Sequence, residues 1–162
     1  MTDSSVARPP LPSPRYFDDF AEGQVFAFGR IEVSEAEALA FGRRYDPQSI
    51  HVDKTAAAAG PFRGLILSGW HTAALMMRLY AENILDDASS LGSPGIDELR
   101  WLKPVRPGDT LSLRVTVTEA RRSRSKPDRG IVTNFVEVLN QRDEVVMTLK
   151  PMNLIRCRPA RA

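Results

Sequence analysis

The segment from Leu65 to Ile84 reads LILSGWHTAALMMRLYAENI, and its pattern decides the fold. Apolar side chains occupy most faces of a predicted helix between Leu75 and Tyr80, and Arg78 is the only Lys or Arg in the segment. A helix that is apolar on most faces must be covered by protein. Polar and small residues interrupt the segment too often for a membrane span, so a curved sheet wrapped around the helix is the expected cover.

The C-terminal half supplies the strands for that sheet. Leu111, Leu113, Val115 and Val117 alternate with polar residues, which is the period of a strand with one buried face. Similar runs cover 96–103, 131–139 and 145–155, and the last two flank a predicted hairpin loop at 140–143. The sequence therefore predicts an α+β domain in which an antiparallel sheet cradles one long helix.

The N-terminal half predicts one further strand region and two short helices. Apolar residues from Val25 to Val33, interrupted near Gly29, indicate one bent strand or two short ones. A capping box at Ser34 and Glu37 begins a helix that ends before Asp46-Pro47. The second helix runs from Asp53 through the alanines at 56–59 and ends at Gly60-Pro61.

Length and composition predict one folded domain with short tails. The chain has 162 residues, of which 43% are hydrophobic and 26% are charged, which is typical of a single soluble domain. We expect a disordered, proline-rich tail at 1–15, the domain at 16–158 and a second tail at 159–162.

Charge and cysteine content exclude several classes of protein. A net charge of +2 gives no reason to expect nucleic-acid binding, and no apolar run indicates a membrane span or a secretory signal. Cys157 is the only cysteine, which excludes an internal disulfide and a multi-cysteine zinc site. We therefore expect a cytoplasmic protein without a metal.

Asp46 and His51 are the first candidates for chemistry. They lie in the segment YDPQSIH, where proline and short polar residues predict a loop that can fold both side chains onto one water molecule. Alternatively, Asp46 caps a helical turn that begins at Pro47, and His51 is a packed loop residue.

Ser68-Gly69 at the start of the long helix adds a second chemical element. Free N–H groups at a helix start can stabilise a carbonyl oxygen that becomes anionic, and Gly69 would let a substrate approach the backbone. The alternative is that Gly69 only permits tight entry into the helix. Acid–base groups beside an oxyanion donor are what water addition to an α,β-unsaturated thioester requires.

These residues resemble the MaoC-like hydratases, the family of (R)-specific enoyl-CoA hydratases with a hotdog fold. The likeness lies in Asp46-x-x-x-Ile50-His51-x-Asp53, in the Gly69 that follows at the head of an apolar helix, and in IDELRWLKPVRPGD at 96–109. It covers roughly residues 17 to 157, nearly all of the chain outside the tails.

The resemblance implies a catalytic aspartate at Asp46, a catalytic histidine at His51 and an oxyanion-hole amide at Gly69. The family's Asn-Pro pair is replaced by Gln48-Ser49, with proline at position 47 instead, and a helix serine of some members falls near Met77. It also implies reversible hydration of a trans-2-enoyl thioester, with a CoA or carrier-protein thioester as substrate and no further cofactor. A hotdog thioesterase and a non-catalytic acyl-binding or partner subunit remain alternatives.

Other residues of the long helix are expected to be structural. His71 is predicted to be a hydrogen-bonded structural side chain rather than a catalyst. Four more residues are predicted to lie in the core, or otherwise to line a pocket. They are Trp70, Met76, Met77 and Tyr80.

A basic segment lies between two predicted strands. It contains Arg121, Arg122, Arg124, Lys126 and Arg129. Such a loop is usually solvated, and the functional alternative is that Arg122 and Arg124 attract the phosphates of coenzyme A.

The predicted sheet leaves one face and its edges open. Pairing of two copies would cover such surfaces, and the family resemblance likewise implies a homodimer or higher oligomer, with active sites near the subunit interfaces.

Overall fold

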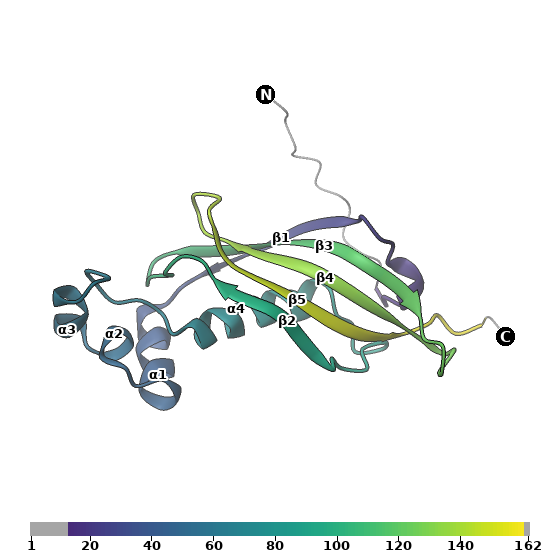
Figure 1. Ribbon diagram of the computed structural model, residues 1–162, viewed down its shortest axis with the longest axis horizontal. Coiled ribbons are helices and arrows are strands. Elements are labelled where there is room, and N and C mark those ends of the chain that lie inside the picture. The colour runs from purple at the N-terminus through teal and green to yellow at the C-terminus, as the bar shows by residue number, and fades with distance from the viewer. Residues whose placement is uncertain (1–12, 161–162) are drawn as a thin grey trace, which may run out of the picture.

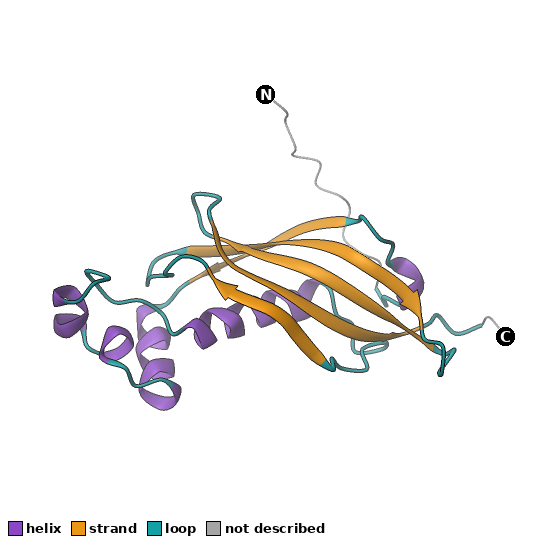
Figure 2. Cartoon of the chain, in the orientation of Figure 1, coloured by secondary structure: helices purple, strands orange, loops and turns teal. Residues whose placement is uncertain are grey.

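The structure is a computed structural model that describes residues 13–160. Its five strands form one antiparallel sheet in the order β1-β3-β4-β5-β2, and helix α4 lies along one face of that sheet (Figure 1). The strands are β1 (Val25–Glu32), β2 (Gly95–Trp101), β3 (Thr110–Arg122), β4 (Arg129–Leu139) and β5 (Val145–Arg156). The helices are the 3-10 turn η1 (Phe17–Asp19), α1 (Glu35–Tyr45), α2 (Ser49–Val52), α3 (Lys54–Ala59) and α4 (Gly69–Asn83). This is the predicted α+β arrangement, and α1, α2 and α3 gather at one end of the sheet (Figure 2).

The inner face of the sheet carries the predicted alternation. Leu111, Leu113, Val115 and Val117 of β3 are each at most 1% exposed, while the residues between them point away from the core. The neighbouring strand β4 is in antiparallel register, with Leu113 opposite Val138. Together with the buried side of α4, these side chains form one continuous core.

Strand β1 is a single bent strand. Its pairing with β3 shifts register between Phe28 and Ile31, and Gly29 within this bulge has φ +84°, a conformation that favours glycine. A Cβ atom at Gly29 would lie 2.8 Å from Leu79 Cδ2 of α4. The glycine therefore both bends the strand and allows the long helix to pack closely against it.

Both helices predicted in the N-terminal half form, and a side chain caps the start of each. Ser34 accepts a hydrogen bond from the Glu37 N–H at the start of α1. Asp53 accepts hydrogen bonds from the N–H groups of Thr55 and Ala56 at the start of α3, which ends at Gly60 as predicted.

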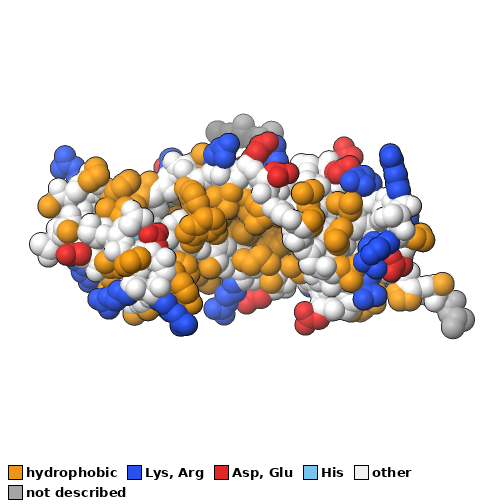
Figure 3. All heavy atoms as spheres, turned by 60° about the horizontal axis from the view of Figure 1, so that its bottom comes forward, with side chains coloured by type: hydrophobic (Ala, Val, Ile, Leu, Met, Phe, Trp, Pro, Cys, Tyr) orange, Lys and Arg blue, Asp and Glu red, His pale blue; other side chains and the backbone are white. Residues whose placement is uncertain are grey.

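One side of α4 is left uncovered, which corrects part of the sequence interpretation. Met76 and Tyr80 are buried as predicted. Trp70 is 62% exposed and Met77 is 43% exposed, and each lines a cavity, so the pocket alternative holds for these two residues. The sheet covers only one side of the helix, so the residues on the other side lie at the surface. Figure 3 shows apolar side chains gathered over the hollowed middle of this face.

The ends of the predicted domain are partly described. Residues 1–12 and 161–162, which belong to the predicted tails, lie outside the described residues. The backbone N–H of Arg15 donates to the Asp86 carboxylate at 3.2 Å, so the last residue of the predicted N-terminal tail contacts the domain. Among the described helices, none is long and apolar enough to cross a membrane.

Candidate active site

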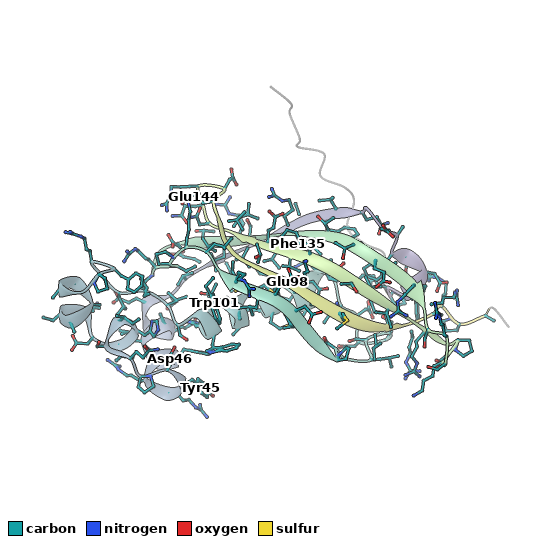
Figure 4. All side chains as sticks on the ribbon, viewed as in Figure 1. Tyr45, Asp46, Glu98, Trp101, Phe135 and Glu144 are labelled. Carbon is teal, nitrogen blue, oxygen red and sulfur yellow. The ribbon has the colours of Figure 1, made fainter. Side chains whose placement is uncertain are left out.

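A cavity of about 460 Å³ opens at the start of α4. Asp46 and His51 line one side of it, Gly69 lies at the helix start, and Trp70 and Trp101 contribute apolar surface. Figure 4 shows Asp46 close to the α1–α2 connection and Trp101 at the end of β2 that faces this group of helices. The cavity therefore lies where the helical end of the molecule meets the sheet.

Asp46 and His51 face each other across a short gap. His51 Nε2 lies 3.3 Å from Asp46 Oδ2, and the two side chains are 7% and 18% exposed. Two polar atoms at this separation can both contact one water molecule that sits between them and the open cavity. The structure thus brings together the carboxylate and the imidazole that the sequence predicts as partners.

The local structure differs from the predicted loop. Helix α1 ends at Tyr45 before Pro47, and Asp46 follows it as the C-cap in a non-helical conformation. His51 then lies in the short helix α2, whose N-cap is Gln48, so the prediction of an irregular loop at His51 is wrong. The alternative in which Asp46 caps the turn is also wrong, because its carboxylate points toward His51 and Ser68.

Gly42 sets the distance between these two helices. A Cβ atom at Gly42 would lie 2.8 Å from Val52 Cγ1 and 3.2 Å from the His51 carbonyl oxygen. A larger residue at position 42 would push α2 away. Gly42 was not among the predicted site residues, since only the tertiary contact reveals its role.

The hydrogen bond of the other imidazole nitrogen orients His51. His51 Nδ1 lies 2.9 Å from the carbonyl oxygen of Ile66, which can only accept a hydrogen bond. Nδ1 must therefore carry a proton, and Nε2 is the nitrogen that faces Asp46 and the cavity.

The Asp46 carboxylate is held by two further donors. Gln48 Nε2 donates to Oδ1 at 2.7 Å, and the Ser68 hydroxyl donates to Oδ2 at 2.7 Å. The hydrogen bond from Gln48, followed by that from Ser68, lowers the pKa of Asp46 below its usual value. Asp46 is therefore an anion at neutral pH. The sequence predicts Ser68 only as a residue at the helix start, and its hydrogen bond to Asp46 was not predicted.

The start of α4 offers unpaired N–H groups. The Ser68 carbonyl accepts hydrogen bonds from the N–H groups of His71 and Thr72, but its side chain makes no cap hydrogen bond. Gly69 is the first residue of the helix, so its N–H has no acceptor within the helix. The helix dipole adds partial positive charge at this point, which favours an anionic oxygen.

The missing side chain of Gly69 makes room for Trp101. A Cβ atom at Gly69 would lie 2.5 Å from Trp101 Cε2, and the indole N–H donates to the Gly69 carbonyl at 2.9 Å. The two interpretations of Gly69 from the sequence, close approach of a substrate and tight entry into the helix, did not include this contact. Trp101 covers one side of the helix start, and the Trp70 ring meets it edge-on with ring centroids 5.3 Å apart.

His71 is a packed side chain, as predicted, but without the predicted hydrogen bond. Its ring is buried and stacks on Phe41 with centroids 4.7 Å apart. Nδ1 has no hydrogen-bond partner among residues 13–160. Burial lowers the pKa of His71 more than the nearby Glu37 raises it, so the ring stays neutral at neutral pH.

The predicted phosphate-binding arginines do not lie at this cavity within one chain. Arg122 ends β3, whereas the opposite end of that strand approaches α1 (Figure 1). Its guanidinium pairs with Asp18 at 2.7 Å and lies 5.8 Å from the centre of the Phe17 ring. Arg124 follows in the β3–β4 turn. In the part of the chain that the structure describes, no cluster of three metal-ligating side chains occurs.

Comparison with known proteins assigns the chain to a family. The sequence of residues 19–139 matches the family model of the MaoC-like domain. YdeM of Bacillus subtilis (strain 168) is 32% identical over 126 residues, which are 78% of this chain and 88% of that protein. The protein thus belongs to the class of hotdog-type domains that carry an Asp–His pair at the head of the long helix. The chain is a member of the MaoC-like domain family.

Solved structures agree with this assignment. A MaoC-like dehydratase from Rhodospirillum rubrum has a TM-score of 0.83 and 39% identity, covering 90% of this chain and 99% of that chain. The (R)-hydratase from A. caviae, involved in PHA biosynthesis, has a TM-score of 0.67 and 24% identity, covering 86% and 98%. A double-hotdog protein from Mycobacterium tuberculosis has a TM-score of 0.76 and 20% identity, covering 91% of this chain and 46% of its own. The fold is therefore the hotdog fold.

Proposed function

We propose that the protein catalyses the reversible hydration of a trans-2-enoyl thioester to a 3-hydroxyacyl thioester. The observation that carries the proposal is the Asp46–His51 pair, 3.3 Å apart on the wall of a cavity that also reaches Gly69. Membership of the MaoC-like domain family and the likeness to a MaoC-like dehydratase support it. The acyl carrier is coenzyme A or a carrier protein, and no cofactor is required.

The proposed reaction uses each group for one task. Asp46 and His51 hold a water molecule and take one of its protons while its oxygen bonds to the β-carbon. The electron pair of the double bond moves toward the thioester oxygen, and the Gly69 N–H stabilises the enolate that forms. A proton is then delivered to the α-carbon from the same pair, which completes the addition of water, and dehydration runs through the same steps in reverse.

The magnitude of each contribution requires that these groups act together. Acid–base assistance is typically worth about 10² to 10⁴ in rate, and one oxyanion donor about 10² to 10³. Neither contribution alone accounts for an efficient hydratase.

One assay of the purified wild-type chain tests the proposal. A panel of trans-2-enoyl-CoA thioesters is followed at once for loss of the conjugated double bond and for release of free thiol. We expect double-bond loss without thiol release. Thiol release would instead identify a thioesterase, and binding without either signal would identify a non-catalytic acyl-binding subunit.

The arginines of the β3–β4 turn give a separate prediction. Because Arg122 is paired with Asp18 and lies away from the cavity, we expect Arg122→Ala plus Arg124→Ala to leave KM for an enoyl-CoA within about twofold. Loss of the exposed ion pair and of the contact with Phe17 should lower the free energy of unfolding by about 1 kcal/mol or less. A KM that rises in this variant, and that rises with salt in the wild type, would instead support phosphate binding.

We further propose that two copies of the chain associate. The exposed Trp70 and Met77 lie on the side of α4 that the sheet leaves open, and β1 and β2 are edge strands of the sheet. Large exposed apolar surfaces of this kind usually mark protein contacts. Sedimentation equilibrium at micromolar concentration should show a dimer or larger assembly, and a monomer would contradict the proposal.

A further inference from the structure

The Ser68 hydroxyl is used in an unusual way for a residue at a helix start. Serine at an N-cap normally accepts a hydrogen bond from an N–H in the first turn of the helix. Ser68 is the N-cap of α4, but its side chain makes no such bond and donates to Asp46 Oδ2 at 2.7 Å instead. Ser68 is only 2% exposed, so water cannot readily replace this partner.

The bond fixes the orientation of the carboxylate. A carboxylate can rotate about its terminal torsion, which has a broad energy minimum. Gln48 holds Oδ1 and Ser68 holds Oδ2, the oxygen that faces His51 Nε2. Of the two donors, Gln48 is exposed and Ser68 is buried, so Ser68 is the more rigid constraint. With both oxygens held, Oδ2 stays directed at the imidazole.

Ser68 also places the acid–base pair next to the open helix start. The Ser68 backbone carbonyl accepts from His71 and Thr72, but its hydroxyl hydrogen is committed to Asp46. The hydroxyl oxygen accepts no hydrogen bond from the first-turn N–H groups. The Gly69 N–H, which as the first of the helix has no acceptor within it, is available at the cavity. One side chain thus connects the acid–base pair to the helix start.

We propose that Ser68 is a positioning residue that directs Asp46 Oδ2 toward His51 and so holds the acid–base pair beside the first N–H of α4. This inference rests on the proposed hydration reaction. Ser68 does not contact the substrate and acts through Asp46.

Kinetics of Ser68→Ala provide the first test. A hydrogen bond to a charged group contributes about 1.5–3 kcal/mol, so we expect kcat to fall by about 10- to 100-fold. KM should change by less than about threefold, because the cavity walls stay in place. Ser68→Thr retains the hydroxyl and should recover most of the lost kcat. Ser49→Ala, an exposed serine of the same region, is the matched control and should behave like the wild type.

Titration of Asp46 provides a second test that does not depend on activity. Hydrogen bonds from Gln48 and Ser68 to the ionised carboxylate lower the pKa of Asp46, and among the described residues His51 is the titratable side chain that faces it. Removing the Ser68 donor should therefore move the Asp46 pKa upward. The protein is labelled with ¹³Cγ aspartate, the Asp46 signal is assigned by its absence in Asp46→Asn, and its midpoint is compared between the wild type and Ser68→Ala.

The two measurements separate this inference from the proposed function. An unmoved Asp46 midpoint together with kcat within about twofold of the wild type would overturn the role of Ser68 while leaving the hydratase intact. A raised midpoint in a protein that hydrates no enoyl thioester would support the contact of Ser68 with the pair and overturn the reaction.

Discussion

Asp46→Asn and His51→Ala are each expected to lower kcat/KM for enoyl thioester hydration by about 10²- to 10⁴-fold. Asparagine keeps the shape of the side chain but cannot accept a proton from water, and alanine removes the Nε2 atom that lies 3.3 Å from Asp46. The double-bond assay measures both variants at several substrate concentrations. Because the two groups act on one water molecule, the double variant should be little slower than the slower single variant.

A nearby aspartate offers a matched control for the first substitution. Asp53 caps α3 through the N–H groups of Thr55 and Ala56 and does not line the cavity. Asparagine caps a helix about as well as aspartate, so Asp53→Asn should keep both the fold and the activity. Wild-type rates in both Asp46→Asn and His51→Ala would remove these residues from the mechanism.

Local sequence rules were sufficient for the elements that position the site. The alternation at 111–117 predicts a strand with one buried face. The capping residue Ser34 and the helix pattern that begins at Asp53 predict two helix starts that the structure confirms. These features depend on neighbouring residues, so one sequence contains the necessary information. For Asp46 and His51, local patterns left a structural alternative open, and the family resemblance pointed to the pair. The short helix α2 that carries His51 was not predicted.

The rest of the site depends on contacts between distant segments. The Ser68 hydroxyl reaches a carboxylate 22 residues earlier, and Trp101 donates to a carbonyl 32 residues before it. A serine before a helix is ordinarily interpreted as a cap, which hides its role toward Asp46. For Trp70 the sequence left two alternatives, because a large apolar residue on a long apolar helix is expected first in the core. Only the fold shows that this side of α4 is uncovered, which leaves Trp70 exposed on the wall of the cavity.

Gly69→Ala is expected to lower kcat/KM by about 10²- to 10³-fold, the loss typical of one oxyanion donor. Alanine is a better helix former than glycine, so helix propensity alone would make this substitution stabilising. The new Cβ atom would lie 2.5 Å from Trp101 Cε2, however, and the indole also holds the Gly69 carbonyl. Either the ring or the helix start must move, and the N–H then no longer faces the thioester oxygen.

A double-mutant cycle with Trp101→Ala decides why glycine is needed. Trp101→Ala alone should weaken substrate binding, because the ring lines the cavity. If the clash is the reason for glycine, adding Gly69→Ala to this variant should cost less than about threefold, so the two substitutions would be strongly non-additive. If Gly69→Ala costs as much without the ring as with it, then the substrate itself occupies the space beside the backbone. Close approach of the thioester, and not room for Trp101, would then be what requires glycine at this position.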